Sequence, residues 1–221
     1  MLKPNNKRAK RAITMIGVVL LCQFLLIICQ ITLAQFLGKV NLENGLDQES
    51  ILALEEVQQN LNLSFLLWSV AFLISSVTFI MWFRRAYYNL HQLLPYLRFS
   101  EGWAAGSWFV PFLNLVRPFQ ILRELFDESN ELLQKHYGNK EIFASGQLIG
   151  VYWIGSILYY VVDQINRTQE PILSDANTAW WDVASFSILF ITGLALIRLV
   201  HNYSLIEDHL HQITPEDPEQ V

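Results

Sequence analysis

Four long stretches without a charged side chain divide the sequence. They lie between Arg11 and Lys39 (27 residues), Glu56 and Arg84 (27), Glu141 and Asp163 (21), and Asp182 and Arg198 (15). About 20 apolar residues are enough for a helix to cross the hydrocarbon core of a bilayer. Trp180 and Trp181 extend the shortest stretch into the headgroup region, which indole rings prefer. The pattern therefore predicts four transmembrane helices, at residues 13–37, 61–83, 142–162 and 179–199.

The first stretch has an alternative interpretation as a cleaved signal peptide. It begins with a basic segment at residues 7–11, and Thr32-Leu33-Ala34 resembles a cleavage site. Its apolar run is, however, much longer than the ~7–15 residues of a signal-peptide core. The length favours an uncleaved helix, and a mature N-terminus near Gln35 would contradict it.

The composition agrees with a membrane protein. Only 16% of the 221 residues are charged and 52% are hydrophobic, whereas a soluble domain carries about 25% charged residues. These values exclude a disordered chain and a disulfide-framed secreted module. Cys22 and Cys29 lie on one predicted helix, too far apart to bridge each other, and are interpreted as packing residues.

The basic residues orient the predicted helices. Lys and Arg number five in the N-terminal segment, one in residues 38–60, seven in 84–141, one in 163–178 and one at the C-terminal end. Because cytoplasmic loops retain basic residues, both termini and the 84–141 loop are expected in the cytoplasm. The net charge of −5 comes from acidic outer loops and an acidic C-terminal end, so a nucleic-acid partner has no support.

The domain organisation follows from these assignments. We expect a basic cytoplasmic N-tail (1–12), a four-helix membrane domain (13–200) with a cytoplasmic loop at 84–141, and an acidic cytoplasmic C-tail (201–221).

Ionisable side chains are missing from the four charge-free stretches. The gaps were defined by the absence of Asp, Glu, Lys and Arg, and all five histidines also lie outside them. Proton relays, ion-coupled transport and intramembrane proteolysis need ionisable groups at membrane depth. His209 and His211 match zinc signatures only loosely, and phosphate-loop, dinucleotide and nucleophile-elbow motifs are absent from the sequence. We therefore predict no enzymatic activity, no metal site and no cofactor.

Uncharged polar and small residues inside the spans predict helix packing. Gln23 and Gln30 share a face of the first predicted helix, and Gln147 lies near the start of the third. A buried amide in lipid favours interhelical hydrogen bonding. Gly146 and Gly150 form a G-x-x-x-G motif, which allows helices to approach closely.

The loop at residues 84–141 is the most distinctive segment. Arg84 and Arg85 are expected at the phosphates where the second span ends, and that helix is expected to continue past the membrane surface. Residues 102–116 carry no charge and are interrupted by Gly and Pro. This run is too short to span, so it suits an interfacial or a re-entrant element. Trp103 and Trp108 both favour the headgroup boundary.

A strongly amphipathic helix is predicted from Pro118 to Tyr137, followed by Gly138-Asn139. Only Ser129 and His136 interrupt its apolar half, and its polar half carries four acids and two bases. A helix that lies on lipid carries Lys and Arg on its polar face. The charge therefore favours packing within the protein over docking of a partner, and either of these over lipid contact.

A set of short motifs runs through this loop. The motifs are Arg84-Arg85 with Asn89, Arg98-Phe99-Ser100, Gly102-Trp103-Ala104 with Gly106, Trp108-Phe109-Val110-Pro111, Asn114-Leu115-Val116-Arg117-Pro118, and Glu124-Leu125. The set resembles a bacterial integral-membrane family, domain of unknown function 4328, from about residue 60 to the end of the fourth predicted helix. The family pattern has a proline where this chain has Glu101. The resemblance implies a bacterial cytoplasmic (inner) membrane protein with four helices.

These observations predict an all-α fold, an integral membrane four-helix bundle with an amphipathic or re-entrant cytoplasmic segment between helices 2 and 3. The favoured function is a non-enzymatic scaffold that docks a protein partner through the cytoplasmic 84–141 hairpin. The alternative is a protein that binds or moves a lipid or a small anionic ligand at the cytoplasmic interface, where arginine suits bidentate phosphate contact. The residues expected to contact a ligand or partner are Arg84, Arg85, Asn89, Trp103, Trp108, Pro111, Asn114, Arg117, Pro118 and Glu124.

Overall fold

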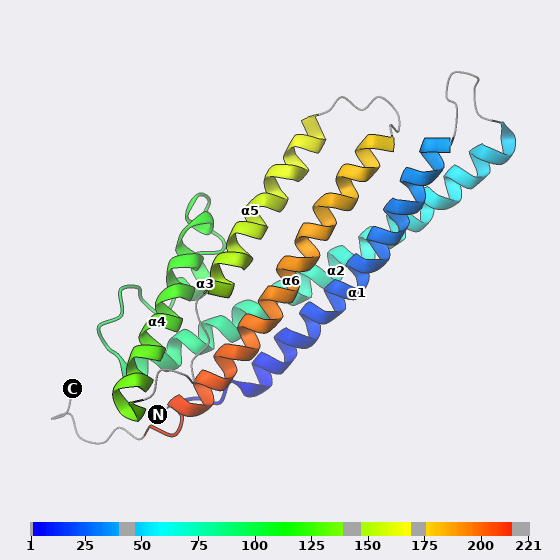
Figure 1. Ribbon diagram of the computed structural model, residues 1–221. Helices are drawn as coiled ribbons and strands as arrows, with labels where there is room; N and C mark the ends of the chain where they lie inside the picture. The colour runs from blue at the N-terminus through cyan, green and yellow to red at the C-terminus, as the bar shows by residue number, and fades with distance from the viewer. Residues whose placement is uncertain (1, 40–46, 139–146, 169–175, 214–221) are drawn as a thin grey trace. The chain divides into compact units, whose positions relative to one another are not determined.

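The computed structural model describes residues 2–39, 47–138, 147–168 and 176–213 (Figure 1). These residues form helices and no β-strand, which confirms the all-α prediction. The α-helices are α1 (Asn6–Lys39), α2 (Gln48–Leu93), α3 (Trp103–Gly106), α4 (Arg117–Tyr137), α5 (Gln147–Thr168) and α6 (Ala176–Leu210), and a short 3-10 helix, η2 (Leu113–Leu115), precedes α4.

Four of the helices, α1, α2, α5 and α6, are long and apolar enough to cross a membrane. They contain 34, 46, 22 and 35 residues, whereas crossing requires about 20. Each of them coincides with one predicted span, except that residues 142–146 of the third lie outside the described residues. The chain is therefore a multi-pass membrane protein.

The long helices continue beyond the ends of the predicted spans. α2 reaches Leu93, as expected for a helix that runs past the membrane surface. α1 begins within the expected N-tail, and α6 continues to Leu210 through the first half of the expected C-tail. The cause is apolar periodicity, because Tyr203, Ile206 and Leu210 are buried on one face of α6. The tail boundaries placed at residues 12 and 201 therefore differ from the helix ends.

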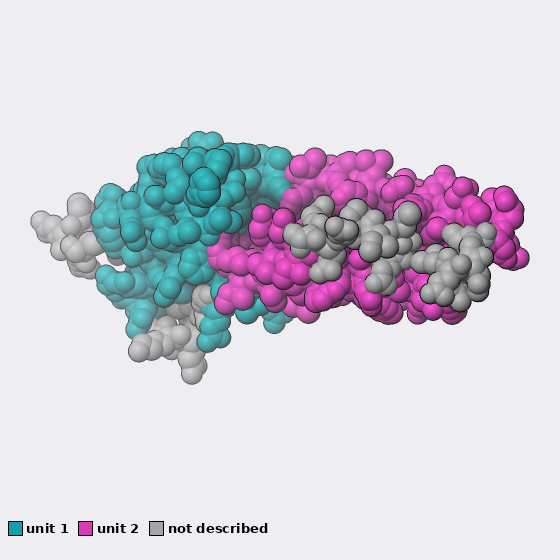
Figure 2. Space-filling model, turned by 90° about the horizontal axis from the view of Figure 1, so that it is seen from above, with its two compact units in different colours: residues 1–15, 75–151, 195–221 teal, residues 16–74, 152–194 magenta. Residues whose placement is uncertain are grey.

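The described chain divides into two compact units (Figure 2). Unit 1 comprises residues 1–15, 75–151 and 195–221, and unit 2 comprises residues 16–74 and 152–194. Unit 1 therefore contains α3, η2 and α4 together with one end of each long helix.

The core of unit 1 is aromatic. Trp82 of α2 and Tyr203 of α6 are fully buried, and their rings meet edge to face with centroids 6.0 Å apart. Phe126 of α4 lies 5.2 Å from the Tyr203 ring. Contacts of this kind stabilise a fold beyond the area that they bury, so they hold α2, α4 and α6 together.

Helix α4 contributes one face to this core. Ser129, a polar residue within the predicted apolar half, is fully buried and its hydroxyl lies 3.2 Å from that of Tyr203. A left-handed residue, Gly138 with φ +68°, ends the helix as predicted. The buried residues of α4 are Pro118, Ile121, Leu122, Leu125, Phe126, Ser129 and Leu133.

Two of the three predicted amides bridge helices in unit 2. The Nε2 group of Gln23 donates to the carbonyl oxygen of Phe186 at 2.6 Å, and that of Gln30 donates to Asp182 Oδ2 at 3.3 Å. These contacts confirm the predicted hydrogen bonding between helices. Gln147, in contrast, is exposed at the start of α5.

Close helix approach occurs at glycines outside the predicted motif. Gly146 lies outside the described residues, and nothing lies within 4 Å of the position that a Cβ on Gly150 would take. A Cβ on Gly155 would lie 2.8 Å from Thr192 Oγ1, and one on Gly193 would lie 2.6 Å from Leu20 Cδ2. These two glycines therefore let α5 and α1 approach α6 within unit 2.

Candidate functional site

Side chains of α2 and α4 fix the chain at residues 98–99. The N–H group of Arg98 donates to Glu124 Oε1 at 2.7 Å, and the hydroxyl of Tyr87 lies 2.6 Å from Glu124 Oε2. The Phe99 carbonyl oxygen accepts from His91 Nε2 at 2.8 Å and lies 3.1 Å from the same hydroxyl, whose single hydrogen favours the nearer carboxylate. Hydrogen bonds to a carboxylate are about twice as strong as neutral ones, so Phe99 is held in a defined position.

Two arginines lie against the ring of Phe99. The guanidinium carbons of Arg117 and Arg98 lie 4.7 and 5.3 Å from its centroid, and that of Arg117 also lies 5.2 Å from the Trp103 ring. These distances fit cation–π contacts. Within the described part of the chain, neither guanidinium forms an ion pair with an acid. We call Arg98, Phe99, Trp103 and Arg117 the arginine–aromatic cluster.

An exposed apolar loop, residues 109–116, lies between Trp103 and Arg117 in the sequence. The exposed fractions of Phe109 and Phe112 are 75% and 85%, and Leu115 and Val116 are also exposed. Phe112 has φ +63° and is the one non-glycine residue in the described ranges with a positive φ. A bulky residue in that region is strained, and such strain concentrates at functional segments. Contiguous exposed apolar side chains mark a membrane or protein contact.

Trp108 attaches the apolar loop to the end of the second span. Its ring meets those of Phe79 and Phe83 edge to face, with centroids 5.7 and 6.4 Å apart. Both phenylalanines belong to the last two turns of the predicted span 61–83, immediately before Arg84. The apolar loop therefore adjoins the part of α2 at which the predicted span ends.

The structure brings together only some of the ten predicted site residues. Trp103 and Arg117 belong to the cluster, Glu124 holds it in place, and Trp108 lies at the base of the loop. Pro118 is buried in the first turn of α4. Four others lie elsewhere. Arg84 forms an ion pair with Glu101 at 3.5 Å, and the guanidinium carbon of Arg85 lies 5.8 Å from the centroid of the Tyr88 ring. The N–H group of Asn114 donates to the Val110 carbonyl oxygen at 3.0 Å, and Pro111 is exposed.

The tenth residue, Asn89, belongs to a second cluster inside unit 1. Its side-chain amide pairs with the backbone of Lys3, accepting from the N–H group at 2.9 Å and donating to the carbonyl at 2.8 Å. The same Nδ2 donates to Glu207 Oε1 at 2.7 Å, and Asn5 Nδ2 donates to Glu207 Oε2 at 2.9 Å. Asn5, Asn89 and Glu207 are each only 1% exposed. We call Lys3, Asn5, Asn89 and Glu207 the Glu207 cluster.

The electrostatics of Glu207 are those of a carboxyl group removed from water. Burial raises its pKa to about 7, and the amide donors of Asn89 and Asn5 act in the opposite direction. Asp208 also raises this pKa, whereas Arg85 lowers it. Burial likewise raises the pKa of the Tyr203 hydroxyl, one turn earlier on α6.

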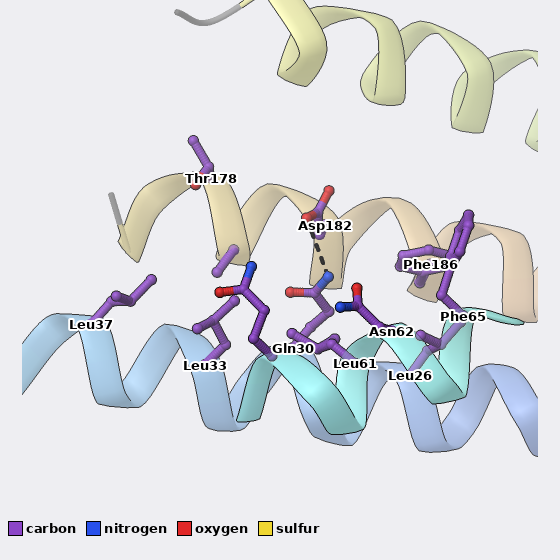
Figure 3. A pocket seen from close by; sticks show the side chains of 12 residues that line it. Leu26, Gln30, Leu33, Leu37, Leu61, Asn62, Phe65, Thr178, Asp182 and Phe186 are labelled. Carbon is purple, nitrogen blue, oxygen red and sulfur yellow. Dashed lines mark hydrogen bonds between the residues drawn. The ribbon is translucent and has the colours of Figure 1, made fainter. Parts of the chain in front are cut away.

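Unit 2 contains a cleft of about 370 Å³ between α1, α2 and α6 (Figure 3). Asp182 faces the amides of Gln30 and Asn62 across it, among leucine and phenylalanine side chains. Its carboxylate accepts hydrogen bonds from Gln30 and from Asn166 Nδ2, the latter at 2.7 Å. These bonds join α1, α5 and α6, so the polar groups of the cleft support the packing of unit 2.

Sequence reasoning omitted several residues of both clusters. Arg98 and Phe99 entered only as a family motif, and Tyr87 and His91 were not considered. Glu207 could have been found, because it lies four residues after Tyr203 on the apolar face of α6. An acid on such a face is a candidate for a buried ionisable group.

The spans and the packed loop define a multi-pass α-helical membrane protein. Its chain belongs to the family described as domain of unknown function (DUF4328), which matches residues 51–205. This region contains the whole arginine–aromatic cluster and the apolar loop. No curated protein and no solved structure matches the chain.

Proposed function

We propose that this protein binds anionic phospholipid at the cytoplasmic face of a bacterial inner membrane, through the arginine–aromatic cluster and the apolar loop. The observation that carries the proposal is the pair of guanidinium groups on Phe99, without an acidic partner in the described chain, beside the exposed Phe109 and Phe112. Guanidinium groups bind phosphate oxygens in a bidentate manner. The distribution of Lys and Arg supports a cytoplasmic location for this part of the chain.

An interfacial position of the apolar loop fits better than a re-entrant one. Inserting Phe109 and Phe112 among acyl chains would contribute on the order of 1.5–3 kcal/mol each, if they become fully buried. The loop satisfies part of its own backbone, because the N–H groups of Leu113 and Asn114 donate to the carbonyls of Pro111 and Val110. A shallow turn of this kind needs no surrounding protein wall, whereas a deep one does.

The proposed role is binding without catalysis. Both oxygens of Glu124, the carboxylate beneath the cluster, accept hydrogen bonds from Arg98 N–H and from Tyr87. A carboxylate held in this way positions Arg98, and the site needs no reacting group to select an anionic headgroup.

Spin-labelled lipids test the proposal on the full chain in bilayers. Phosphatidylglycerol and phosphatidylcholine probes would be compared by the fraction that the protein immobilises. Because a basic residue near the surface is worth about 1 kcal/mol of attraction to anionic lipid, each lost arginine should lower the preference for phosphatidylglycerol about fivefold. The variant is Arg98→Ala/Arg117→Ala.

The matched control removes two other bases. Arg123 and Lys135 are exposed on α4 and paired with Asp127 and Glu131 at 3.4 and 3.0 Å. Arg123→Ala/Lys135→Ala changes the net charge by the same amount and should leave the lipid preference close to that of the wild type. An equal loss of phosphatidylglycerol preference in both double variants would show that net charge alone sets the preference, and would contradict the site.

A second candidate function, the protein scaffold, rests on the polar face of α4. The apolar face of this amphipathic helix is used within unit 1, so a partner would meet the acids. Burial and the neighbouring charges of Glu131 and Glu124 raise the pKa of Glu128, which marks a concentration of negative charge. Such a face suits a basic segment of a partner protein.

Photo-crosslinking in cells tests the scaffold. A crosslinking residue at position 131 should form protein adducts that disappear when Asp127 and Glu128 are neutralised, whereas one at the exposed Gln92 of α2 should form none. Absence of adducts at position 131 would contradict this second candidate.

A further inference from the structure

The cleft of unit 2 has a polar level and an apolar level (Figure 3). The polar level consists of Gln30, Asn62 and Asp182. The apolar level consists of Leu26, Phe65 and Phe186. On each of α1, α2 and α6, the apolar residue lies about one helical turn further into the predicted span than the polar one. The volume of about 370 Å³ falls within the range of about 300–1,000 Å³ for small-ligand pockets, and the two levels match the head and the chain of an amphiphile.

The polar level has acceptors that lack a donor. Two amides donate to the Asp182 carboxylate, Gln30 through Nε2 at 3.3 Å and Asn166 through Nδ2 at 2.7 Å. The oxygens of the same amides, Gln30 Oε1 and Asn166 Oδ1, are buried without a hydrogen-bond partner in the described chain. A buried acceptor without a donor destabilises a fold, so such atoms are rare and call for an explanation. A ligand that brings donors into the cleft would satisfy Gln30 Oε1.

Asp182 sets the charge that such a ligand should carry. It is the one charged side chain among the twelve described residues that line the cleft. A carboxylate offers about four acceptor positions, and an ammonium group offers three donors and no acceptor. A primary ammonium can therefore donate to Asp182 and to Gln30 Oε1 at the same time. A quaternary ammonium carries the same charge but has no N–H group, so it would leave Gln30 Oε1 without a donor.

We propose that the cleft of unit 2 binds an amphiphile with a primary ammonium head. The head donates to Asp182 and Gln30, and the alkyl chain packs along the apolar level. An alkylamine and the ethanolamine head of a phospholipid both carry this group. The site is independent of the anionic-lipid site proposed above, because it selects a positive charge and shares no residue with the arginine–aromatic cluster or the apolar loop.

Native mass spectrometry of the full chain, released from detergent micelles, tests the site with dodecylamine and dodecyltrimethylammonium. The two probes share chain and charge, and only the first has N–H donors. Because hydrogen bonds to charged groups are the stronger ones, dodecylamine should form a single adduct about tenfold more tightly than dodecyltrimethylammonium. Equal affinities of the wild type for both probes would overturn the proposal. Phosphatidylethanolamine identifies the source: displacement of dodecylamine by this lipid supports a site for a lipid head, and dodecylamine binding that the lipid does not displace supports a site for free alkylamines.

Three variants complete the test. Asp182→Asn removes the charge at nearly constant shape and should weaken dodecylamine binding about tenfold or more, and Gln30→Met removes the second acceptor and should weaken it severalfold. The matched control is Glu56→Gln, which neutralises an exposed acid of α2 that lies in unit 2 but does not line the cleft. Wild-type affinity in Asp182→Asn, or an equal loss in Glu56→Gln, would overturn the proposal. If Asp182→Asn does not fold, a loss in Gln30→Met supports the site, and an unchanged affinity overturns it.

Discussion

Glu124 and Glu207 differ in their access to water, although each accepts two hydrogen bonds. Glu124 is half-buried and receives one of its bonds from a backbone N–H group. Glu207 is 1% exposed and receives both of its bonds from amide side chains. The first carboxylate remains a fixed anchor, whereas the second couples the fold to pH.

The first prediction concerns the stability of the fold against pH. The pKa of Glu207 rises from 4.5 to about 7 on folding, so the folded state binds this proton more tightly than the unfolded state. The stabilisation is fully present below about pH 4.5 and is lost as pH rises through about 7. It amounts to about 3 kcal/mol at 1.36 kcal/mol per pKa unit. Unfolding in detergent should show this loss in the wild type and a flatter profile in Glu207→Gln; parallel profiles would contradict it.

The second prediction concerns Tyr87, which joins α2 to the Glu124 anchor. Tyr87→Phe leaves Glu124 Oε2 without its donor and should lower the free energy of unfolding by about 1–3 kcal/mol. Tyr160→Phe is the control, because the Tyr160 side chain is 65% exposed and has little to lose. Denaturant titration of both variants measures the difference. A Tyr87→Phe protein as stable as the control would show that the Tyr87–Glu124 contact contributes nothing to folding.

At the scale of elements, the apolar loop combines strain with exposure. The third prediction is that Phe112→Gly separates stability from lipid binding. Glycine adopts φ +63° without strain, so relief of about 1–3 kcal/mol of strain should raise the free energy of unfolding. Loss of the phenyl ring should at the same time weaken insertion of the loop into bilayers.

The measurement for the loop pairs unfolding with a depth probe. A spin label at position 109 should be more accessible to oxygen than to a water-soluble relaxation agent, and Phe112→Gly should shift that ratio toward water. A label at the exposed Ser100 is the aqueous control. A label at 109 that resembles the one at Ser100 would place the loop outside the bilayer.

The sequence predicts these elements well, but predicts their contacts only in part. Charge-free stretches locate the spans because desolvation excludes charge from hydrocarbon, and the 3.6-residue period locates the helix that begins near Pro118. The pairing of Arg98 with Arg117 on Phe99 depends on how residues 94–102 turn back along α2. That turn is fixed by Tyr87, His91 and Glu124, whose hydrogen bonds join residues 8 to 37 positions apart and leave no periodic signal. The continuation of α6 to Leu210 could have been predicted from the sequence, because the apolar period of this helix runs past Arg198.

At the scale of the whole molecule, the position of the basic residues sets the orientation in the membrane. Thirteen of the fifteen Lys and Arg residues lie in the N-terminal segment, the 84–141 loop and the C-terminal end. The fourth prediction is that all three regions face the cytoplasm, since basic loops are retained on that side. The proposed lipid site requires this orientation, because the cytoplasmic leaflet supplies the anionic headgroups.

Single cysteines in a Cys22→Ser/Cys29→Ser background report the orientation in intact cells. A membrane-impermeant maleimide should label the exposed position 48 directly, and should reach the exposed positions 114 and 212 only after the membrane is permeabilised. The three sites lie on different segments, so the pattern separates a reversed chain from a misplaced loop. Labelling of 114 and 212 but not 48 in intact cells would reverse the whole topology. Labelling of positions 48 and 114 but not 212 in intact cells would mean that the loop crosses the bilayer, and would remove the physical basis of the proposed lipid site.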